Sequence, residues 1–291
     1  MTEEQPSARP PAVTPSDVHA LAAFLALHRS LVLTGAGIST DSGIPDYRGV
    51  NRRAPAPKPM TYQEFVRGEE ARRRYWSRSA VGWAHMAQRA PNAGHAAVAR
   101  LEDLGRLTGV VTQNVDGLHR KAGTRELVEL HGDLALVVCL NCGAREEREG
   151  YQQRMLTANP GFVPDAVPLL PDGDAAVDPE VARTFAVPVC AVCGGVMKPD
   201  VIFFGENVPR PRLERAWDRL AAADGLVVLG SSLEVFSGYR FVRAAHTQGK
   251  AVAVVNHGPT RADGEVELRL EARIADVLPA AVAELESALP T

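Results

Sequence analysis

The sequence has few aromatic residues (5%), a net charge of only −3 and no long apolar run. A chain without an excess of basic residues lacks the electrostatic footprint of a nucleic-acid-binding protein. No apolar run approaches the ~20 residues that cross a bilayer, and the opening residues, MTEEQPSARPP, lack the apolar core of a secretory signal. We therefore expect a globular, cytoplasmic protein with neither nucleic acid nor membrane as a partner.

Cysteine is also scarce: the chain has four cysteines, in two CxxC pairs, Cys139 with Cys142 and Cys190 with Cys193. A two-residue spacer lets both thiolates of a pair face one ion, and two pairs complete the tetrahedron of sulfur ligands that zinc accepts. Disulfides or a redox dithiol are the alternatives, but a chain of this length can bury a core without covalent links. Because sulfur fills all four positions, we expect a structural zinc, with the catalytic groups elsewhere.

Short apolar runs that are typical of strands alternate with stretches of helical periodicity over most of the chain. The expected strands are residues 31–34, 109–114, 126–132, 225–232 and 251–256. The expected helices are one that follows an N-cap at Ser16, and residues 93–104, 210–223, 237–248 and 275–288. This alternation predicts an α/β fold with a Rossmann-like, doubly wound parallel sheet.

Two segments interrupt the alternation and predict a smaller lobe. The proline-rich stretch and helical run of residues 51–89 form one insertion, and the zinc-binding residues 139–195 form the other. We expect both to lie over the crevice of a main domain built from residues 14–50, 90–138 and 196–291. A disordered lead is expected at residues 1–13.

Small or polar residues stand at the ends of the expected strands, where open α/β sheets bind their ligands. They are Thr34 with Gly35, Gln113 with Asn114, His131 with Gly132, Gly230 with Ser231, and Asn256. The turn Gly35-Ala36-Gly37 has the first two glycines of a dinucleotide fingerprint but carries Thr40 at the third position. By itself it fits either a plain turn or a nucleotide site of unspecified kind.

Five runs are more specific when they are taken together: TGAGISTDSGIPDYRG, VVTQNVDGLHRKAG, ELHG, KPDVIFFGE and GSSLEV, with the CxxC pairs between the third and the fourth. In this order, over nearly all of residues 15–290, the sequence resembles the sirtuins, NAD-dependent protein-lysine deacylases. The run ARRRYWSRSAVGW and the long segment between the CxxC pairs are similar to the class II branch, which includes the mitochondrial sirtuin-four type, and favour a bacterial member. The resemblance implies that the main domain binds NAD. It also implies acyl transfer from acyl-lysine to ADP-ribose, with release of nicotinamide and 2′-O-acyl-ADP-ribose.

The resemblance also assigns catalytic residues. His131 matches the family's base, which deprotonates the ribose, and an imidazole with an ordinary pKa near ~6.5 suits this task. Asn114 is expected to orient the ribose, and Asp116 to meet the nicotinamide carboxamide. A lone histidine at a strand end is more often a structural residue, and we keep that interpretation for His95 and His119.

Further contacts implied by the resemblance lie on the loops after the strands. Those to the cofactor are Gly35, Ala36, Gly37, Ser39, Thr40, Ile44, Asp46, Tyr47, Arg48, Gln113, Gly230, Ser231, Ser232, Asn256, His257, Gly258 and Ile274. An extended acyl-peptide is expected to add as a strand between two segments. Their residues are Ile202, Phe203, Phe204, Gly205 and Glu206, and Leu233, Glu234 and Val235.

The sequence indicates less clearly which acyl group the substrate lysine carries. Tyr75 and Arg78 are similar to the Tyr-x-x-Arg pair of the desuccinylating class, which would favour an acidic acyl tail. The alternative places Arg78 on an exposed helix face with Arg72, Arg73 and Arg74, and leaves acetyl or long apolar acyl-lysine as the substrate. For the whole chain, mono-ADP-ribosyl transfer and a non-catalytic NAD- or zinc-binding module are the competing interpretations.

Overall fold

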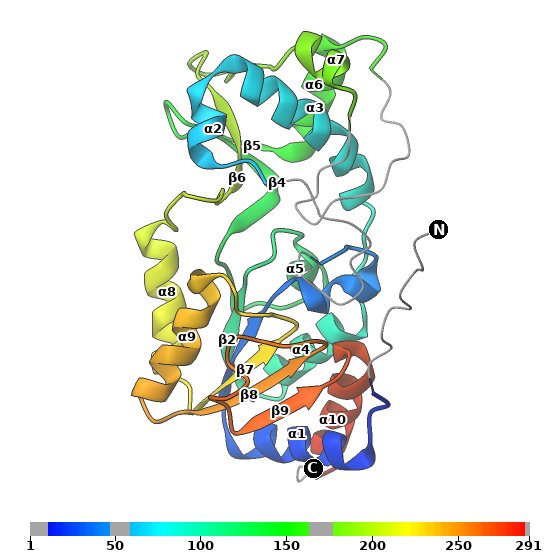
Figure 1. The fold of residues 1–291 in the computed structure, drawn as a ribbon, viewed down its shortest axis with the longest axis vertical. Coiled ribbons are helices and arrows are strands. Elements are labelled where there is room, and N and C mark those ends of the chain that lie inside the picture. Colours follow the sequence, from blue (N-terminus) through cyan, green and yellow to red (C-terminus); the bar gives the residue numbers. More distant parts are fainter. Residues whose placement is uncertain (1–10, 47–58, 163–176, 289–291) are drawn as a thin grey trace, which may run out of the picture.

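The computed structural model describes residues 11–46, 59–162 and 177–288, which form two lobes (Figure 1). The larger lobe is built around a six-stranded sheet and the smaller one around a three-stranded sheet. Most of the lead expected at residues 1–13, and the predicted cofactor residues Tyr47 and Arg48, lie outside the described residues.

The large sheet has the strand order β3-β2-β1-β7-β8-β9, and all of its strand pairs are parallel. Its strands are β1 (Ser30–Thr34), β2 (Leu107–Thr112), β3 (Leu127–Glu129), β7 (Gly225–Leu229), β8 (Ala251–Asn256) and β9 (Leu268–Glu271). Strands β2 and β3 follow β1 toward one edge of the sheet, and β8 and β9 follow β7 toward the other edge. The direction in which strands are added therefore reverses between β1 and β7. This arrangement confirms the predicted doubly wound fold, and such a reversal is where open α/β sheets bind ligands.

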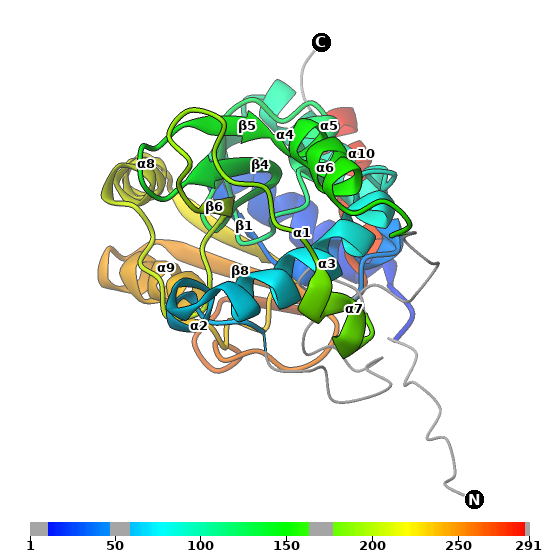
Figure 2. The same cartoon turned by 90° about the horizontal axis from the view of Figure 1, so that it is seen from above.

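Helices cover both faces of the large sheet, because its strands alternate apolar side chains between the faces (Figures 1 and 2). On β1, Val32 belongs to one core, whereas Leu31 and Leu33 belong to the other. The first core includes α1 (Pro15–Leu27), α4 (Ala93–Asp103) and α10 (Ile274–Ala288), and the second includes α8 (Arg210–Ala221) and α9 (Phe236–Thr247). With both faces covered, a ligand reaches this sheet at its carboxyl edge.

The first helix corrects one expectation, because Thr14 and not Ser16 is its N-cap. The Thr14 hydroxyl accepts a hydrogen bond from the Asp17 backbone N–H at 3.2 Å, and the Asp17 carboxylate accepts one from the Thr14 N–H at 2.8 Å. This reciprocal pair, with Pro15 at the first helical position, is a complete capping box. Strand β9 was not expected from the sequence, because its four residues, LRLE, include two charged side chains.

The small lobe contains an antiparallel sheet in the order β5-β4-β6. Its elements are α2 (Tyr62–Arg67), α3 (Glu69–Met86), β4 (Gly132–Cys139), β5 (Arg145–Glu147), α6 (Arg148–Ala158), α7 (Pro179–Thr184) and β6 (Met197–Val201). Aromatic side chains from three of its helices, Phe65, Trp76 and Tyr151, are buried in its core. The domain limits stay a prediction, and the pairing of β4 with β6 favours an insertion that runs from Gly132 to Val201.

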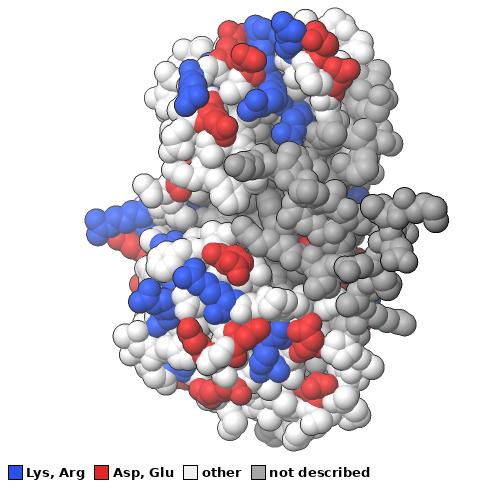
Figure 3. Space-filling view, in the orientation of Figure 1, with Lys and Arg blue, Asp and Glu red and all other residues white. Residues whose placement is uncertain are grey.

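Charge is mixed over the surface. On the face seen in Figure 3, described lysine and arginine side chains are interspersed with aspartate and glutamate over both lobes. This mixture agrees with a net charge of −3. No helix in the described part of the chain has the length and apolar character needed to cross a membrane.

Candidate functional site

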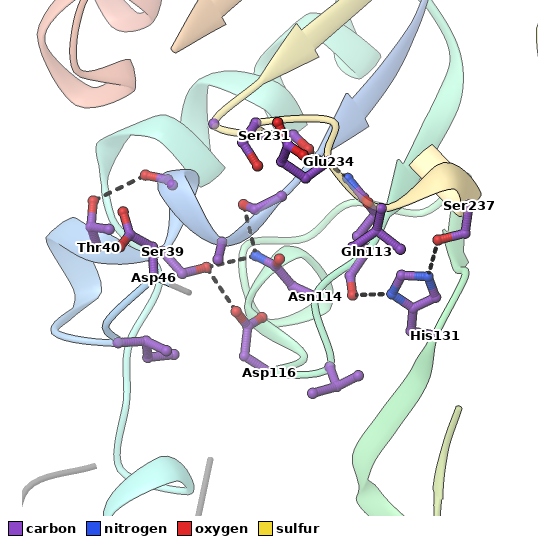
Figure 4. A pocket seen from close by; sticks show the side chains of 18 of the residues that line it. Ser39, Thr40, Asp46, Gln113, Asn114, Asp116, His131, Ser231, Glu234 and Ser237 are labelled. Atoms are coloured by element: carbon purple, nitrogen blue, oxygen red, sulfur yellow. Dashed lines mark hydrogen bonds between the residues drawn. The ribbon is translucent and has the colours of Figure 1, made fainter. Parts of the chain in front are cut away.

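A cavity of about 1160 Å³ is formed at the carboxyl ends of β1, β2, β7 and β8 (Figure 4). The large lobe contributes the loops that follow these strands, and the small lobe contributes residues 201–206 and Tyr75 of α3. Small-molecule pockets usually measure ~300–1,000 Å³. The cavity therefore has room for a large ligand or for parts of two ligands.

Glycines bring the loops after β1 and β7 together at this cavity. The Gly37 N–H donates to the Gly230 carbonyl at 2.8 Å. A Cβ on Gly35 would lie 2.7 Å from the Gly230 oxygen, and a Cβ on Gly230, where φ is +64°, would lie 2.4 Å from the Ile38 nitrogen. Any side chain at these positions would force the two loops apart. Glycine here is thus required by the close approach of two backbones.

Asn114 and Asp116, which follow β2, are joined to the loop after β1 through the Ser39 hydroxyl (Figure 4). Ser39 Oγ donates to Oδ2 of Asp116 at 2.7 Å and lies 3.0 Å from Nδ2 of Asn114, which donates to it. Oδ1 of Asp116 accepts from the backbone N–H of Leu118, the first residue of α5 (Leu118–Lys121), at 2.9 Å. Both polar side chains are therefore held in place at the cavity wall.

Two buried histidines stand behind this network. The rings of His95 and His119 pack edge to face at 4.9 Å, and Nε2 of His119 lies 3.0 Å from the Thr34 hydroxyl. Burial and the neighbouring His95 lower the pKa of His119 to about 3, and burial also lowers the pKa of His95. Neither ring lines the cavity. Both rings are neutral near pH 7, as their burial requires.

His131 lies where the chain leaves the large sheet, after Glu129 at the end of β3, and enters the small one at Gly132. Its Nδ1 is 2.9 Å from the Gln113 carbonyl oxygen, and its Nε2 is 2.8 Å from the Ser237 hydroxyl. Burial is the main cause that lowers the pKa of His131 to about 4. The imidazole is therefore neutral at pH 7 and has a nitrogen lone pair with which it can accept a proton.

Both predicted peptide-binding segments line the cavity: residues 202–206, which follow β6, and residues 233–235, which follow β7. Leu233 has φ +59°, a backbone conformation that costs a residue with a Cβ about 1 kcal/mol or more. The adjacent Glu234 is exposed. Strain of this kind is concentrated in segments that bind ligands.

The aromatic residues near these segments divide between core and cavity. Phe203 is 9% exposed and packs against Phe65 and Tyr75, whereas Phe204 is 43% exposed. Tyr75 also lines the cavity, but Arg78, half-buried and one turn further along α3, is not among the described lining residues. An aromatic wall is thus available to an apolar ligand stem.

Apart from Arg78, every predicted cofactor or substrate residue that the structure describes lines this cavity. Sequence reasoning missed Ser237 and Arg273, which also line it. Arg273 directly precedes the predicted Ile274 and forms an ion pair with Asp41. Ser237 stands two residues after the GSSLEV run, and only the folded structure brings it to His131.

The four cysteines form one cluster in the small lobe, and none of them lines the cavity. Their Sγ atoms all lie within 4.8 Å of one another, with 3.6 Å between Cys139 and Cys193 and 3.8 Å between Cys142 and Cys190. Zinc–sulfur bonds of about 2.3 Å in a tetrahedron place the sulfurs roughly 3.8 Å apart. A disulfide bond is much shorter, about 2.05 Å. The cluster therefore fits a structural zinc ion.

Comparisons with known proteins agree with this architecture. The model of the Sir2 family matches residues 35–237. NAD-dependent protein deacetylase 1 of Streptomyces coelicolor is 53% identical over 254 residues, which cover 87% of this chain and 84% of that protein. The NAD-dependent protein deacetylase of Xanthomonas axonopodis pv. citri is 48% identical over 268 residues, which cover 92% of each chain.

Solved structures of Sir2 proteins share the fold. A Sir2 protein with a p53 peptide and NAD+ is 28% identical with a TM-score of 0.72, and the match covers 92% of this chain and 98% of that one. Sir2Tm bound to a propionylated peptide is also 28% identical with a TM-score of 0.69, over 91% of this chain and 97% of that one. On the family model, the relatives and the shared fold, the chain belongs to the Sir2 family.

Proposed function

We propose that this chain catalyses the NAD-dependent removal of acyl groups from protein lysine residues. The observation that carries the proposal is the neutral imidazole of His131, at the wall of a cavity that also contains the glycine turn and the peptide-binding segments. The bacterial relatives named above are NAD-dependent protein deacetylases, which supports the same reaction. The products are nicotinamide, the free lysine and 2′-O-acyl-ADP-ribose.

The cavity has suitable groups for each part of NAD, which would supply ADP-ribose as the acyl acceptor and nicotinamide as the leaving group. The glycine turn at Gly35 has no side chain that would keep a ligand away from its backbone, and a pyrophosphate binds to backbone N–H groups in this way. Asn256 ends β8 and lines the cavity, and we assign it to the adenosine ribose. Asp116, fixed by Ser39, can accept hydrogen bonds from the nicotinamide carboxamide.

His131 is the proposed base. Its Nδ1 faces the Gln113 carbonyl, which can only accept, so Nδ1 carries the proton and Nε2 carries the lone pair. Nε2 can then take the proton of a ribose hydroxyl when that hydroxyl attacks the acyl carbon. Asn114, which donates a hydrogen bond to the Gly35 carbonyl at 3.1 Å, is the residue that we assign to orienting the ribose.

The acyl-peptide is proposed to lie between residues 202–206 and 233–235 as an added strand, with Phe204 covering the lysine stem. The zinc acts at a distance from this chemistry. Cys139 ends β4, and the pair Cys190 and Cys193 precedes β6, so one ion would join these two paired strands, and residues 202–206 directly follow β6. We therefore assign the zinc a structural role.

Finer assignments also belong to this proposal. The YWSR run on α3, and a segment between the CxxC pairs that is long enough to hold α6 and α7, favour the class II branch. Four thiols arranged for a metal, with no disulfide pairing among the described residues, favour a cytoplasmic location. Whether acetyl-lysine or a longer acyl-lysine is preferred depends on Tyr75 and Arg78.

A panel of acyl-lysine peptides with NAD tests the proposal directly. We expect nicotinamide and deacylated peptide to form in equal amounts and only when both substrates are present. Nicotinamide release with transfer of ADP-ribose to protein, and without peptide deacylation, would favour the mono-ADP-ribosyltransferase instead. NAD binding with no turnover on any peptide would leave only a binding module.

A further inference from the structure

Ser237 makes a direct contact with the proposed base. It lies in the first turn of α9, and its hydroxyl is 2.8 Å from Nε2 of His131 (Figure 4). Because the Gln113 carbonyl, 2.9 Å from Nδ1, can only accept, the proton of the neutral ring is on Nδ1. The Ser237 hydroxyl is therefore the donor to Nε2.

The side chain of Ser237 has no competing structural task among the described residues. Serine in a first helical turn often caps the backbone, but α9 has no side-chain cap hydrogen bond. The backbone carbonyl of Ser237, and not its hydroxyl, accepts a hydrogen bond from Nε of Arg240 at 3.1 Å. Ser237 lines the cavity, and among the described residues its hydroxyl contacts the imidazole of His131.

A glycine next to Ser237 allows this close approach. A Cβ on Gly238 would lie 2.5 Å from Oε1 of Gln113, so a larger residue would push the start of α9 away from β2. Gln113 is itself fixed, since its Nε2 donates to the Ser231 hydroxyl at 2.8 Å. The first turn of α9, Gln113 and the imidazole of His131 are thus packed as one unit.

We propose that Ser237 is a positioning residue for His131. Before substrates bind, its hydroxyl donates to Nε2 and keeps the ring in the Nδ1–H tautomer, with Nε2 at the cavity. When the ribose hydroxyl binds, it replaces the Ser237 hydroxyl as the hydrogen-bond donor to Nε2. The O–H bond of the ribose then breaks, an N–H bond forms at Nε2, and the Ser237 oxygen, which can also accept, remains a partner for that N–H. This proposal rests on the deacylase function proposed above.

The pH dependence gives the proposal a distinct signature. Burial lowers the pKa of His131 most, and the hydrogen bond to the Gln113 carbonyl raises it; among the described residues, the charged groups that act on the ring are Arg240 on α9 and Arg212 on α8, and both lower its pKa. A hydrogen bond donated to Nε2 stabilises the neutral ring and so lowers the pKa further. Removal of the Ser237 hydroxyl must then raise the pKa of His131 and move the acidic limb of the rate profile to higher pH.

The test compares Ser237→Ala and Ser237→Thr with the wild-type enzyme in kcat and kcat/KM from about pH 3.5 to pH 9, a range that includes the pKa of His131 at about 4. We expect Ser237→Ala to lower kcat about three- to tenfold, with little change in KM, and to raise the apparent pKa of the acidic limb by roughly 0.5–1 unit, the size of one hydrogen bond. Ser237→Thr, which retains a hydroxyl, should restore most of the rate. Ser287→Ala, an exposed serine of α10, is the matched control.

A second measurement does not depend on turnover. In the wild-type protein, ¹⁵N spectra of the histidine rings should place the His131 proton on Nδ1, and Ser237→Ala should shift the Nε2 resonance, because this nitrogen loses its hydrogen-bond donor. If the wild-type protein gives this spectrum but is inactive, the deacylase function is wrong, while the contact between Ser237 and His131 stands. If the wild-type enzyme is active, and a folded Ser237→Ala variant has the same pH profile and the same spectrum, the proposed role of Ser237 is wrong.

Discussion

Nζ of Lys198 lies 3.1 Å from Oε2 of Glu206, and this ion pair fixes the segment that is proposed to bind the acyl-peptide. Lys198 is 3% exposed and also donates to the carbonyls of Pro199 and Val201. The same Glu206 oxygen accepts from the Phe203 backbone N–H at 2.9 Å. One buried ammonium group therefore holds both ends of the turn that carries Phe204.

Lys198→Met tests this role. We expect the loss of one partner from a largely buried pair to lower the free energy of unfolding by about 3 kcal/mol, and to raise KM for the peptide roughly tenfold as the turn loosens. The double variant Lys198→Met with Glu206→Gln should recover part of the stability, because it leaves no uncompensated charge. Calorimetry and peptide titrations measure both effects. An unchanged KM in a destabilised enzyme would show that the pair supports only the fold.

His131→Ala should abolish deacylation while NAD binding and the melting temperature change little. It removes the proposed proton acceptor without touching the glycine turn, and loss of general-base catalysis typically costs ~10²–10⁴ in rate. Single-turnover rates together with NAD titrations separate the two effects. His246→Ala, an exposed histidine near the end of α9, is the control and should retain the full rate. Turnover above about half of the wild-type value in His131→Ala would contradict the assignment of the base.

Sequence patterns predicted the sheet and most of the site because both depend on local signals. The strands that end at Thr34 and Asn256 are short apolar runs, and small or polar residues directly follow the strands that end at Thr112 and Leu229. Since parallel strands share one carboxyl edge, these residues had to converge. The zinc cluster followed in the same way from the CxxC spacing.

Other features depend on contacts between distant segments, which periodicity does not encode. The expected strand at 126–132 is divided between two sheets, because β3 ends at Glu129 and β4 begins at Gly132. His131 is placed at this junction, and its contact with Ser237 requires α9 to pack against β2. The buried pair of Lys198 and Glu206 likewise depends on a turn whose shape only the folded lobe defines.

Removal of zinc should inactivate the enzyme indirectly. One zinc per chain is expected by metal analysis, since the four Sγ atoms are spaced for a single tetrahedral ion. Cys139→Ser or a strong chelator should lower the melting temperature, because structural zinc contributes folding free energy outright. The rate should fall in parallel with the folded fraction, as no cysteine lines the cavity. A well-folded, active protein without zinc would refute this reading of the cluster.

Acid should destabilise the fold through His119. Its pKa of about 3 in the folded state is below the ordinary value of 6.5, so the unfolded chain binds a proton first as the pH falls. The stabilising contribution is present above pH 6.5 and is lost on acidification, by about 2 kcal/mol at pH 5. Glu129 has the opposite effect on stability as the pH falls. Burial raises its pKa to about 7, so the folded state gains stability when this carboxylate is protonated. His119→Gln should therefore be compared with the wild type: its unfolding free energy should fall less between pH 7.5 and pH 5.

The last prediction concerns the acyl group. Tyr75 lines the cavity among aromatic rings, whereas Arg78 is half-buried and is not among the described residues that line the cavity. A guanidinium that pairs with a carboxylate at the tail of an acyl chain would contribute roughly 1.5–3 kcal/mol, or about ten- to a hundredfold in selectivity. From the placement of Arg78 we expect no such contribution and a preference for acetyl or apolar acyl-lysine.

Arg78→Met decides between these two possibilities when its kcat/KM is measured on acetyl-lysine and succinyl-lysine peptides of the same sequence. We expect both values to change by the same factor, with Arg74→Met, an exposed arginine one turn earlier on α3, as the control for loss of charge. Tyr75→Phe, which keeps the ring and removes the hydroxyl, should also affect both peptides equally. A tenfold or larger loss on the succinyl peptide alone in Arg78→Met would instead place the guanidinium at the acyl tail and make acidic acyl-lysine the preferred substrate, because only a charged tail can gain from that pairing.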